Sequence, residues 1–404
     1  MYFKIKYSHK GKIQETVLVA KSLKDALNKF KNKKLGVLID IEKIDKASFT
    51  EKFLKKLILS KIDLEEFISI LDQMSVMLDA GIAIDLVLEN IVDFIKNRKL
   101  KAIFRSILQD IKAGLSLNAA FKKHEKELGT LVVAMIKLGE ETGDLVGAIK
   151  NLSLILNEIL DNRKRLKKAT RYPMFIVFAM SIAFIIVILF VIPPFKVIFA
   201  QLNIELPLPT KFLLWIEGAI KEYGLYILLG MLMVSGILSY IYNKSEAFRL
   251  KADKFILNVY IVGDVIKLAM IGRFIYVLHH LIDAGIPILD AVDISLNIVE
   301  NFYIKKRLET IKHSIIRGGG ISKGFKESGL FESMIIQMIV AGEESGSLVL
   351  MLQKISNYYL QKYKYIVDNI ATLIEPILIA AISGFVITLA LGIFLPMWNL
   401  IEAM

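Results

Sequence analysis

The sequence predicts a mainly α-helical protein that crosses a membrane several times. Three stretches of about twenty residues carry no charged side chain, which is the length of helix that spans a bilayer core. The sequence also contains an internal repeat, in which similar motifs recur in the same order over about a hundred residues. The predicted fold is a polytopic membrane protein with two homologous cytoplasmic antiparallel helical-bundle domains, three transmembrane helices and a small N-terminal α/β segment.

Transmembrane helices are predicted over 173–195, 223–242 and 376–396. Each run is rich in Ile, Leu, Val, Phe and Met and contains no Asp, Glu, Lys, Arg or His. A buried core helix is the alternative interpretation of an apolar run. The length of all three runs and their freedom from charge favour the membrane.

The distribution of Lys and Arg predicts the orientation. The chain has 52 of these residues, yet 196–222 contains three and the tail after Leu395 none. Because cytoplasmic segments of membrane proteins are enriched in Lys and Arg, both large segments are expected in the cytoplasm and the C-terminus in the periplasm. Basic clusters border the spans: Arg163, Lys164, Arg165, Lys167, Lys168 and Arg171 precede the first, and Lys244, Arg249, Lys251 and Lys254 follow the second.

Composition narrows the possible functions. The net charge of +12 could indicate nucleic-acid binding, attraction to anionic lipid or an acidic partner. Its position beside the spans favours membrane lipid, and no direct nucleic-acid binding is expected. The chain has no cysteine, which excludes disulfides and thiolate chemistry. The first residues, MYFKIKYSHK, lack the apolar region of a signal peptide, so none is expected.

The repeat consists of a helical domain followed by an apolar helix. LDAGIAIDLVLENI at Leu78 matches IDAGIPILDAVDIS at Ile282, and LGEETGDL matches AGEESGSL. The domains are expected over 64–170 and 268–373. The linker 196–222 is expected in the periplasm, and the span 223–242 returns the chain to the cytoplasm, so the two copies are parallel rather than inverted.

Each domain is predicted to be a bundle of about six helices. Apolar residues recur every three or four positions, and prolines are scarce in both copies. Gly81 and Gly285 mark the equivalent turn of each copy. Pro173 and Pro376 stand at equivalent points where the chain is expected to enter the membrane.

The first sixty residues follow a different pattern. FKIKY and ETVLVA alternate around SHKGK, which predicts a β-hairpin. SLKDALNKFKNKK has helical spacing after a Ser cap, and LGVLIDIEKI predicts a third strand. The segment 1–60 is therefore expected to form the small α/β unit.

The duplicated acidic motif gives the candidate site. Three interpretations are open: close helix packing with exposed carboxylates, a carboxylate paired within the bundle or across a subunit interface, and acid–base catalysis or metal binding. The four-residue glycine spacing would place both glycines on one helix face, where a neighbouring backbone can approach. The candidate interaction residues are Gly139, Glu140, Glu141, Gly143, Gly342, Glu343, Glu344 and Gly346.

Other motifs do not predict chemistry. His279-His280 lacks the spacing of a zinc-binding HExxH motif, and the glycine run after Arg317 lacks the pattern of a phosphate-binding loop. No His or Lys stands at a fixed offset from the acidic motif in both copies, as a catalytic set would require. No catalytic residue, metal or cofactor is therefore predicted, and the chain is not expected to be an enzyme.

Taken in order, these motifs resemble the type II secretion F family, which includes the platform proteins of type IV pili. The resemblance covers nearly the whole chain. It includes the two GExxG signatures at Gly139 and Gly342, the RYP and IEP sequences before the first and third spans, and the linker VIPPFKVIFAQLNIELPLPTKFLL. The second copy departs from the first in having Pro287, a longer glycine run and Ser347 in place of Asp144.

The resemblance implies a multi-pass platform in the bacterial inner membrane. Such a protein is expected to bind a hexameric secretion ATPase, pilins or pseudopilins and inner-membrane alignment proteins, and to form a homo-oligomer. A transporter or channel component is the alternative function. The absence of ionisable residues from the spans argues against it, because ion and proton pathways usually need one.

Overall fold

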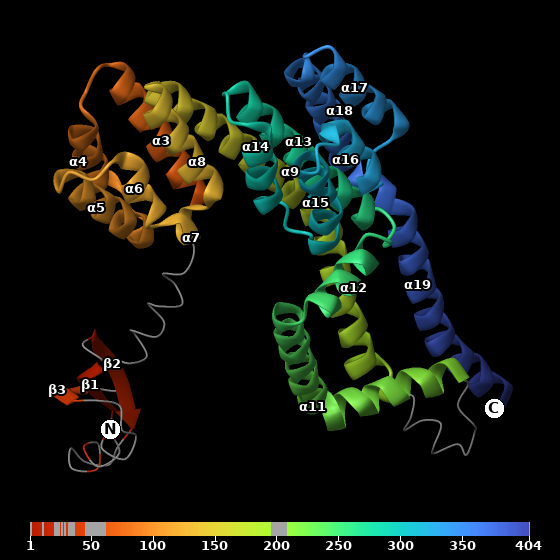
Figure 1. Ribbon diagram of the computed structural model, residues 1–404. Coiled ribbons are helices and arrows are strands. Elements are labelled where there is room, and N and C mark those ends of the chain that lie inside the picture. The colour runs from red at the N-terminus through yellow and green to blue at the C-terminus, as the bar shows by residue number, and fades with distance from the viewer. Residues whose placement is uncertain are drawn as a thin grey trace. The chain divides into compact units, whose positions relative to one another are not determined.

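A computed structural model shows a helical chain with a small sheet near its N-terminus (Figure 1). The structure describes residues 2–9, 12–19, 25, 27, 30, 37–44, 62–194 and 208–403. The chain divides into two compact units, Met1–Glu127 and Leu128–Met404, and each is considered by itself.

The first unit begins with a three-stranded antiparallel sheet. Strands β1 (Tyr2–His9), β2 (Lys12–Val19) and β3 (Val37–Ile44) lie in the order β2-β1-β3. Tyr2 pairs with Val19 on one side and with Ile44 on the other. These strands contain the residues whose alternation predicts strands. Most of the helix predicted between β2 and β3, and the stretch 45–61, lie outside the described residues.

Short helices complete the first unit. They are α3 (Leu64–Asp79), α4 (Ile84–Phe94), α5 (Arg98–Lys112), α6 (Leu117–Lys122) and α7 (Glu125–Leu128). Phe104 packs between Phe67 and Phe121, with ring centroids 6.2 and 6.1 Å away. Asp63, Asn97 and Ser116 cap α3, α5 and α6 through backbone N–H groups of the first turn, as expected for residues of these types.

The second unit contains the long helices. It begins with α8 (Thr130–Thr142) and α9 (Leu145–Ile186), which passes into a π-helical turn at Val187–Val191. After the linker come α11 (Leu208–Lys244) and α12 (Glu246–Ile256). The remaining helices are α13 (Val262–Asp283), α14 (Ile288–Asn297), α15 (Phe302–Ile316), α16 (Gly320–Ser328), α17 (Ser333–Glu344), α18 (Leu348–Asp368) and α19 (Ile370–Ala403).

A bundle of α13 to α18 forms the core of this unit. Helix α13 packs along α18, and its Phe274 is fully buried 6.5 Å from the ring of Phe325. Phe325 in turn lies 4.6 Å from Phe331, which contacts Tyr359 of α18. This row of rings joins four segments of the bundle, and burial of its apolar surface stabilises them against one another.

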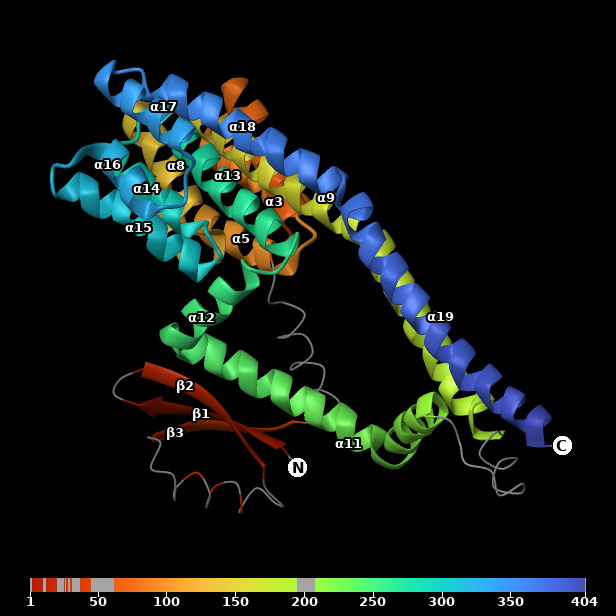
Figure 2. The same cartoon turned by 90° about the vertical axis from the view of Figure 1, so that its right-hand side faces the viewer.

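Among the described residues, four helical stretches are long and apolar enough to cross a membrane. They are the stretches Leu145–Val191, Thr210–Lys244, Val262–Asp283 and Leu348–Leu391. Only 6%, 0% and 11% of the most apolar window is buried in the first, second and fourth, against 56% in the third. The third is α13, whose apolar side chains already face the bundle core. The other three expose theirs along helices that extend away from the bundle (Figure 2).

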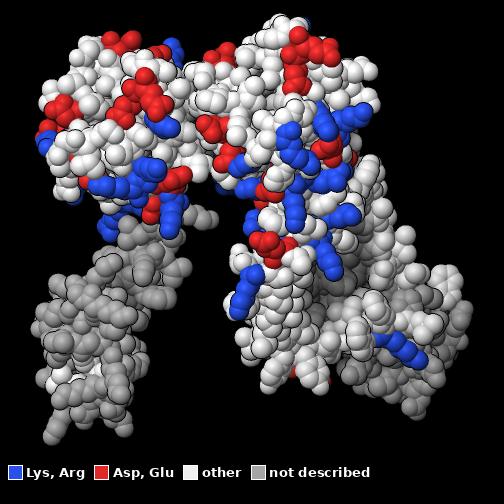
Figure 3. All heavy atoms as spheres, viewed as in Figure 1, with Lys and Arg blue, Asp and Glu red and all other residues white. Residues whose placement is uncertain are grey.

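Charge and apolar surface separate along the second unit. Figure 3 shows Lys and Arg side chains gathered where the bundle meets the long helices, while the described surface of those helices beyond is almost uncharged. In the sequence, basic residues border the apolar segments: Arg163 and Arg165 precede the first, and Lys244 and Lys251 follow the second. Such a border is typical of a protein that enters a lipid bilayer at that level.

The two prolines expected at membrane entry lie inside continuous helices. Pro173 is a buried residue of α9, and Pro376 follows the start of α19 at Ile370. Neither begins a helix, although Pro is favoured in a helix's first turn. Helix α9 instead runs from the signature turn, past Arg163 and Arg165, into the apolar segment.

Candidate functional site

The first glycine of each signature lets two helices approach closely. A Cβ atom on Gly139 would lie 2.8 Å from Ala148 Cβ and 2.9 Å from Leu145 Cα of α9. A Cβ atom on Gly342 would lie 2.8 Å from Met351 Cγ and 3.1 Å from Leu348 Cα of α18. Both glycines therefore do what the packing interpretation predicts: they admit the next helix of the same copy.

The second glycine of each signature has a different role from the predicted one. Helix α8 ends at Thr142, and Gly143 follows it with a φ of 76°; Gly346 has a φ of 68° just after α17. This left-handed conformation is open to glycine and costly for other residues, and it ends the helix. The prediction that both glycines share one helix face is wrong, because the helix stops between them.

Glu343 caps a neighbouring helix. Its carboxylate accepts hydrogen bonds from the backbone N–H groups of Ile321 and Ser322, at 2.8 and 3.0 Å, in the first turn of α16. A Cβ atom on Gly320, whose φ is 76°, would overlap the Glu343 carboxylate. Partial burial raises the pKa of Glu343, but the hydrogen bonds from Ser322 and Ile321 outweigh it and hold the pKa below its usual value.

The other acidic residues of the signatures lie at the surface. Glu141 is 3.6 Å from Lys137, one turn earlier on α8, and both side chains are exposed. Glu344 is exposed at the end of α17, and Glu140 is exposed on α8. Exposed pairs such as Glu141–Lys137 contribute little to stability, so Glu141 and Glu344 can serve as contact groups for another molecule.

Glu141 also lines a groove between α8 and α14. The groove has a volume of about 290 Å³, with Leu138, Ile286 and Pro287 among its apolar residues and Asp290 on its border. It brings one signature residue of the first copy next to the predicted turn of the second. Gly285 in that turn has a φ of 94°, and its counterpart Gly81 has a φ of 78°, as predicted for residues that connect helices.

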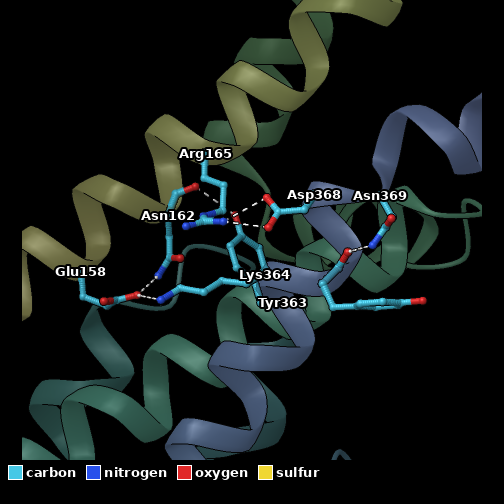
Figure 4. Close-up of polar contacts among 8 residues, drawn as sticks. Glu158, Asn162, Arg165, Tyr363, Lys364, Asp368 and Asn369 are labelled. Atoms are coloured by element: carbon cyan, nitrogen blue, oxygen red, sulfur yellow. Dashed lines mark hydrogen bonds and ion pairs between the residues drawn. The ribbon is translucent and has the colours of Figure 1, made fainter.

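Figure 4 shows a polar junction between α9 and α18 that the sequence did not predict. The Arg165 guanidinium bonds both carboxylate oxygens of Asp368, at 2.8 and 3.0 Å. The hydroxyl of Tyr363 donates to the backbone oxygen of Asn162 at 3.1 Å, and Lys364 lies 3.7 Å from Glu158. The two helices that lead toward the apolar segments are therefore joined by paired charges.

A cavity of about 190 Å³ lies beside this junction. Arg163 and Arg273 both bond Glu300 on its wall, at 2.7 and 3.2 Å. Burial lowers the pKa of Arg273, and the charge of Glu300 opposes that shift. The cavity's charged groups thus neutralise one another within the unit.

The metal-binding interpretation concerns clusters of histidine and carboxylate side chains in the described part of the chain. There, no group of three or more His, Asp or Glu side chains is placed to hold a metal ion. His279 is buried beside His280, with ring centroids 4.9 Å apart, and burial lowers the pKa of both. A neutral core histidine accounts for this arrangement.

Comparison with known proteins defines the class. The family model for type II secretion system protein F matches the chain twice, over residues 70–193 and 274–396. The two matches cover more than half of the sequence and fall on its two copies. The chain belongs to the type II secretion system protein F family.

Curated relatives have names from two kinds of machine. The type IV pilus assembly protein PilC of Pseudomonas aeruginosa is 26% identical over 81% of this chain and 88% of its own length. PilC of Thermus thermophilus is 27% identical over 81% of both chains. The type II secretion system protein F of Vibrio cholerae is 23% identical over 80% of both chains.

Proposed function

We propose that this protein is the inner-membrane platform of a type IV pilus or type II secretion machine. The double match to the protein F family carries the proposal, because it covers both copies of the repeat. Relatives named for pilus assembly and for type II secretion match along about four fifths of the chain. The role is assembly rather than catalysis.

The proposed topology has three spans and two cytoplasmic domains. The span 173–195 begins in α9 and continues through the π-helical turn Val187–Val191, while the spans 223–242 and 376–396 fall within α11 and α19. The domains are 64–170 and 268–373, the linker 196–222 and the C-terminus are periplasmic, and 1–60 is an α/β appendage. Helix α13 stays in the cytoplasmic bundle, since more than half of its apolar window is already buried.

Labelling of single cysteines tests this topology without interference, because the natural chain has none. A membrane-impermeant maleimide should label Lys211→Cys in intact cells. It should label Lys137→Cys and Glu327→Cys only after the cells are opened. Labelling of position 137 or 327 from outside would contradict the proposed orientation.

The proposed mechanism couples a cytoplasmic hexameric ATPase to polymerisation of pilins or pseudopilins. Its structural support is the continuity of α9, which joins the signature turn at Gly143 to the apolar segment without a break. A force applied near that turn would therefore reach the membrane along one rigid element. The exposed Glu141 and Glu344, and the groove beside Glu141, are the proposed contact points.

Deletion and complementation test the platform role. We expect a deletion strain to lose either surface pili or secreted substrate proteins, and the wild-type chain to restore whichever is lost. A chain with Glu141→Lys and Glu344→Lys should be present in the membrane in normal amount and should restore fewer pili or less secretion than the wild-type chain. Lys150→Glu, a charge reversal at an exposed site on α9, is the matched control and should restore fully. Unchanged pili and secretion after deletion would contradict the proposal.

A further inference from the structure

Arg165 and Asp368 occupy the same position in the two copies of the repeat. A separation of 203 residues relates Gly139 to Gly342, Gly143 to Gly346 and Pro173 to Pro376. The same separation relates Arg165 to Asp368, and these two side chains bond each other. At this junction the copies therefore meet through equivalent residues, as the halves of a symmetric dimer do.

We propose that the charges at this junction are a recognition code that pairs the first copy with the second and rejects pairing of either copy with itself. Equivalent residues that meet across a two-fold axis would be identical in a homodimer. Here they have opposite charge, so the pairing observed is the one in which the charges attract. The partner that fits the α9 surface is thus α18, not a second α9.

Pairing of α9 with another α9 would oppose like charges. Arg165 would meet a second Arg165. The residue of the first copy that is equivalent to Lys364 is Asp161. In an α9–α9 pair Glu158 would therefore meet a carboxylate instead of an ammonium group. The position of Tyr363 is held by Leu160, which cannot donate the hydrogen bond that Asn162 accepts.

Pairing of α18 with another α18 fails for the same reason. Asp368 would meet a second Asp368. The position of Glu158 is held in the second copy by Gln361, so Lys364 would lose its carboxylate partner. Each alternative pairing therefore loses both ion pairs and gains at least one like-charge contact. Only the pairing of α9 with α18 keeps both ion pairs.

The code has a consequence for assembly. The side chains of Arg165 and Asp368 are 41% and 54% exposed, so their attraction alone is modest and acts mainly by excluding the alternatives. Because each copy's junction surface is occupied by the other, contacts between separate chains in an oligomer must use other surfaces. This inference concerns the fold of the chain and does not depend on the proposed function.

Cross-linking in membranes tests the code. Phe184 of α9 and Phe385 of α19 lie with ring centroids 5.4 Å apart, so the double variant Phe184→Cys, Phe385→Cys reports the mixed pairing through a short bis-thiol reagent. We expect Arg165→Asp or Asp368→Arg to lower the yield of the intramolecular product about 3- to 10-fold. Combining the two reversals should restore it, because opposite charges then face each other again.

A neighbouring arginine provides the matched control. Arg163 also lies on α9 and is similarly exposed, but it bonds Glu300 rather than Asp368. Any loss caused by Arg163→Asp should therefore not be recovered by adding Asp368→Arg. Recovery as complete as that of Arg165→Asp would mean that net charge, not the specific pair, sets the yield, and would overturn the proposal.

Cross-links between chains test rejection directly. Two differently tagged chains that each carry only Phe184→Cys should give little mixed dimer. They should give more when one of the two chains also carries Arg165→Asp, because opposite charges then face each other across the α9–α9 contact. The proposal would be overturned if two Phe184→Cys chains without any charge reversal cross-linked to each other as efficiently as Phe184→Cys and Phe385→Cys do within one chain. Efficient dimers between a chain with only Phe184→Cys and one with only Phe385→Cys would also overturn it, since the pairing would then lie between chains.

Discussion

The two signature turns share their glycines but differ in their polar residues. Gly139 and Gly342 both admit the following helix, and Gly143 and Gly346 both adopt positive φ. After them, Asp144 accepts a hydrogen bond from the Gly147 N–H at 2.8 Å and caps α9, whereas Ser347 hydrogen-bonds to Ser345. The duplication has thus kept the backbone geometry of the turn and changed the groups that stabilise it.

This comparison shows which part of the motif is structural. Glycine is required where a Cβ atom would collide or where φ is positive, and both requirements hold in both copies. The side chains around the glycines are held by fewer constraints, so they could diverge toward different contacts. Of the equivalent residues Glu141 and Glu344, Glu141 borders the groove between α8 and α14 and lies beside Lys137, whereas Glu344 is exposed at the end of α17.

Replacing the first glycine should have the largest effect and should separate the two copies. Gly139→Ala would place a methyl group against backbone and a short side chain, whereas Gly342→Ala would mainly displace the flexible Met351. We expect about 1–3 kcal/mol of destabilisation at Gly139 and less at Gly342. The measurement is the thermal midpoint of each purified variant in one detergent. A larger loss at Gly342 would contradict the packing described here.

Replacing the second glycine should affect both copies equally. Gly143→Ala and Gly346→Ala meet no steric obstacle, so only the positive φ is penalised, at about 1–2 kcal/mol each. Asn tolerates this conformation better, so Gly143→Asn and Gly346→Asn are the controls and should lose less. Equal midpoints for the Ala and Asn variants would argue against a left-handed turn.

Much of this geometry is predictable from the sequence, and the parts that could not be predicted were missed for physical reasons. Glycines at matching points of a repeat predict turns, and Gly81 and Gly285 adopt positive φ. The spacing of Gly139 and Gly143 is the same on a continuous helix and across a helix end, so spacing alone misplaced Gly143. The bond between Arg165 and Asp368 joins residues 203 apart, and no local pattern reports it. Its one signal is that both stand at equivalent positions.

Removing the caps should distinguish the polar residues of the two turns. Asp144→Ala should destabilise α9 by about 1 kcal/mol, as loss of a cap usually does. Ser347→Ala should cost less, because the Ser347 hydroxyl bonds Ser345 instead of the first turn of α18. Amide hydrogen exchange in the first turns of α9 and α18 measures both effects. Faster exchange after Ser347→Ala than after Asp144→Ala would contradict the difference between the turns.

Acidification should act on Glu343 with the smallest effect. The pKa of Glu343 is lowered in the folded protein. Its contribution to folding stability is therefore fully present above the usual glutamate pKa of 4.5, and is lost as the pH falls through the lower pKa of the folded state. Glu343→Gln should therefore flatten the decline of the thermal midpoint below that pH. Glu344→Gln, at the neighbouring exposed position, is the control and should follow the wild-type curve. Coincident curves for all three proteins would contradict the capping role.

The most direct test of the platform role is photo-cross-linking in living cells from the two signature turns. A photoreactive phenylalanine analogue at position 141 or 344, with one at Leu229 on the exposed face of α11 as control, would trap whatever lies beside each turn. We predict that mass spectrometry will identify a secretion ATPase, pilins or alignment proteins from the turns and no ATPase from position 229. Recovery of none of them from either turn, with the protein abundant in the membrane, would contradict the proposed function.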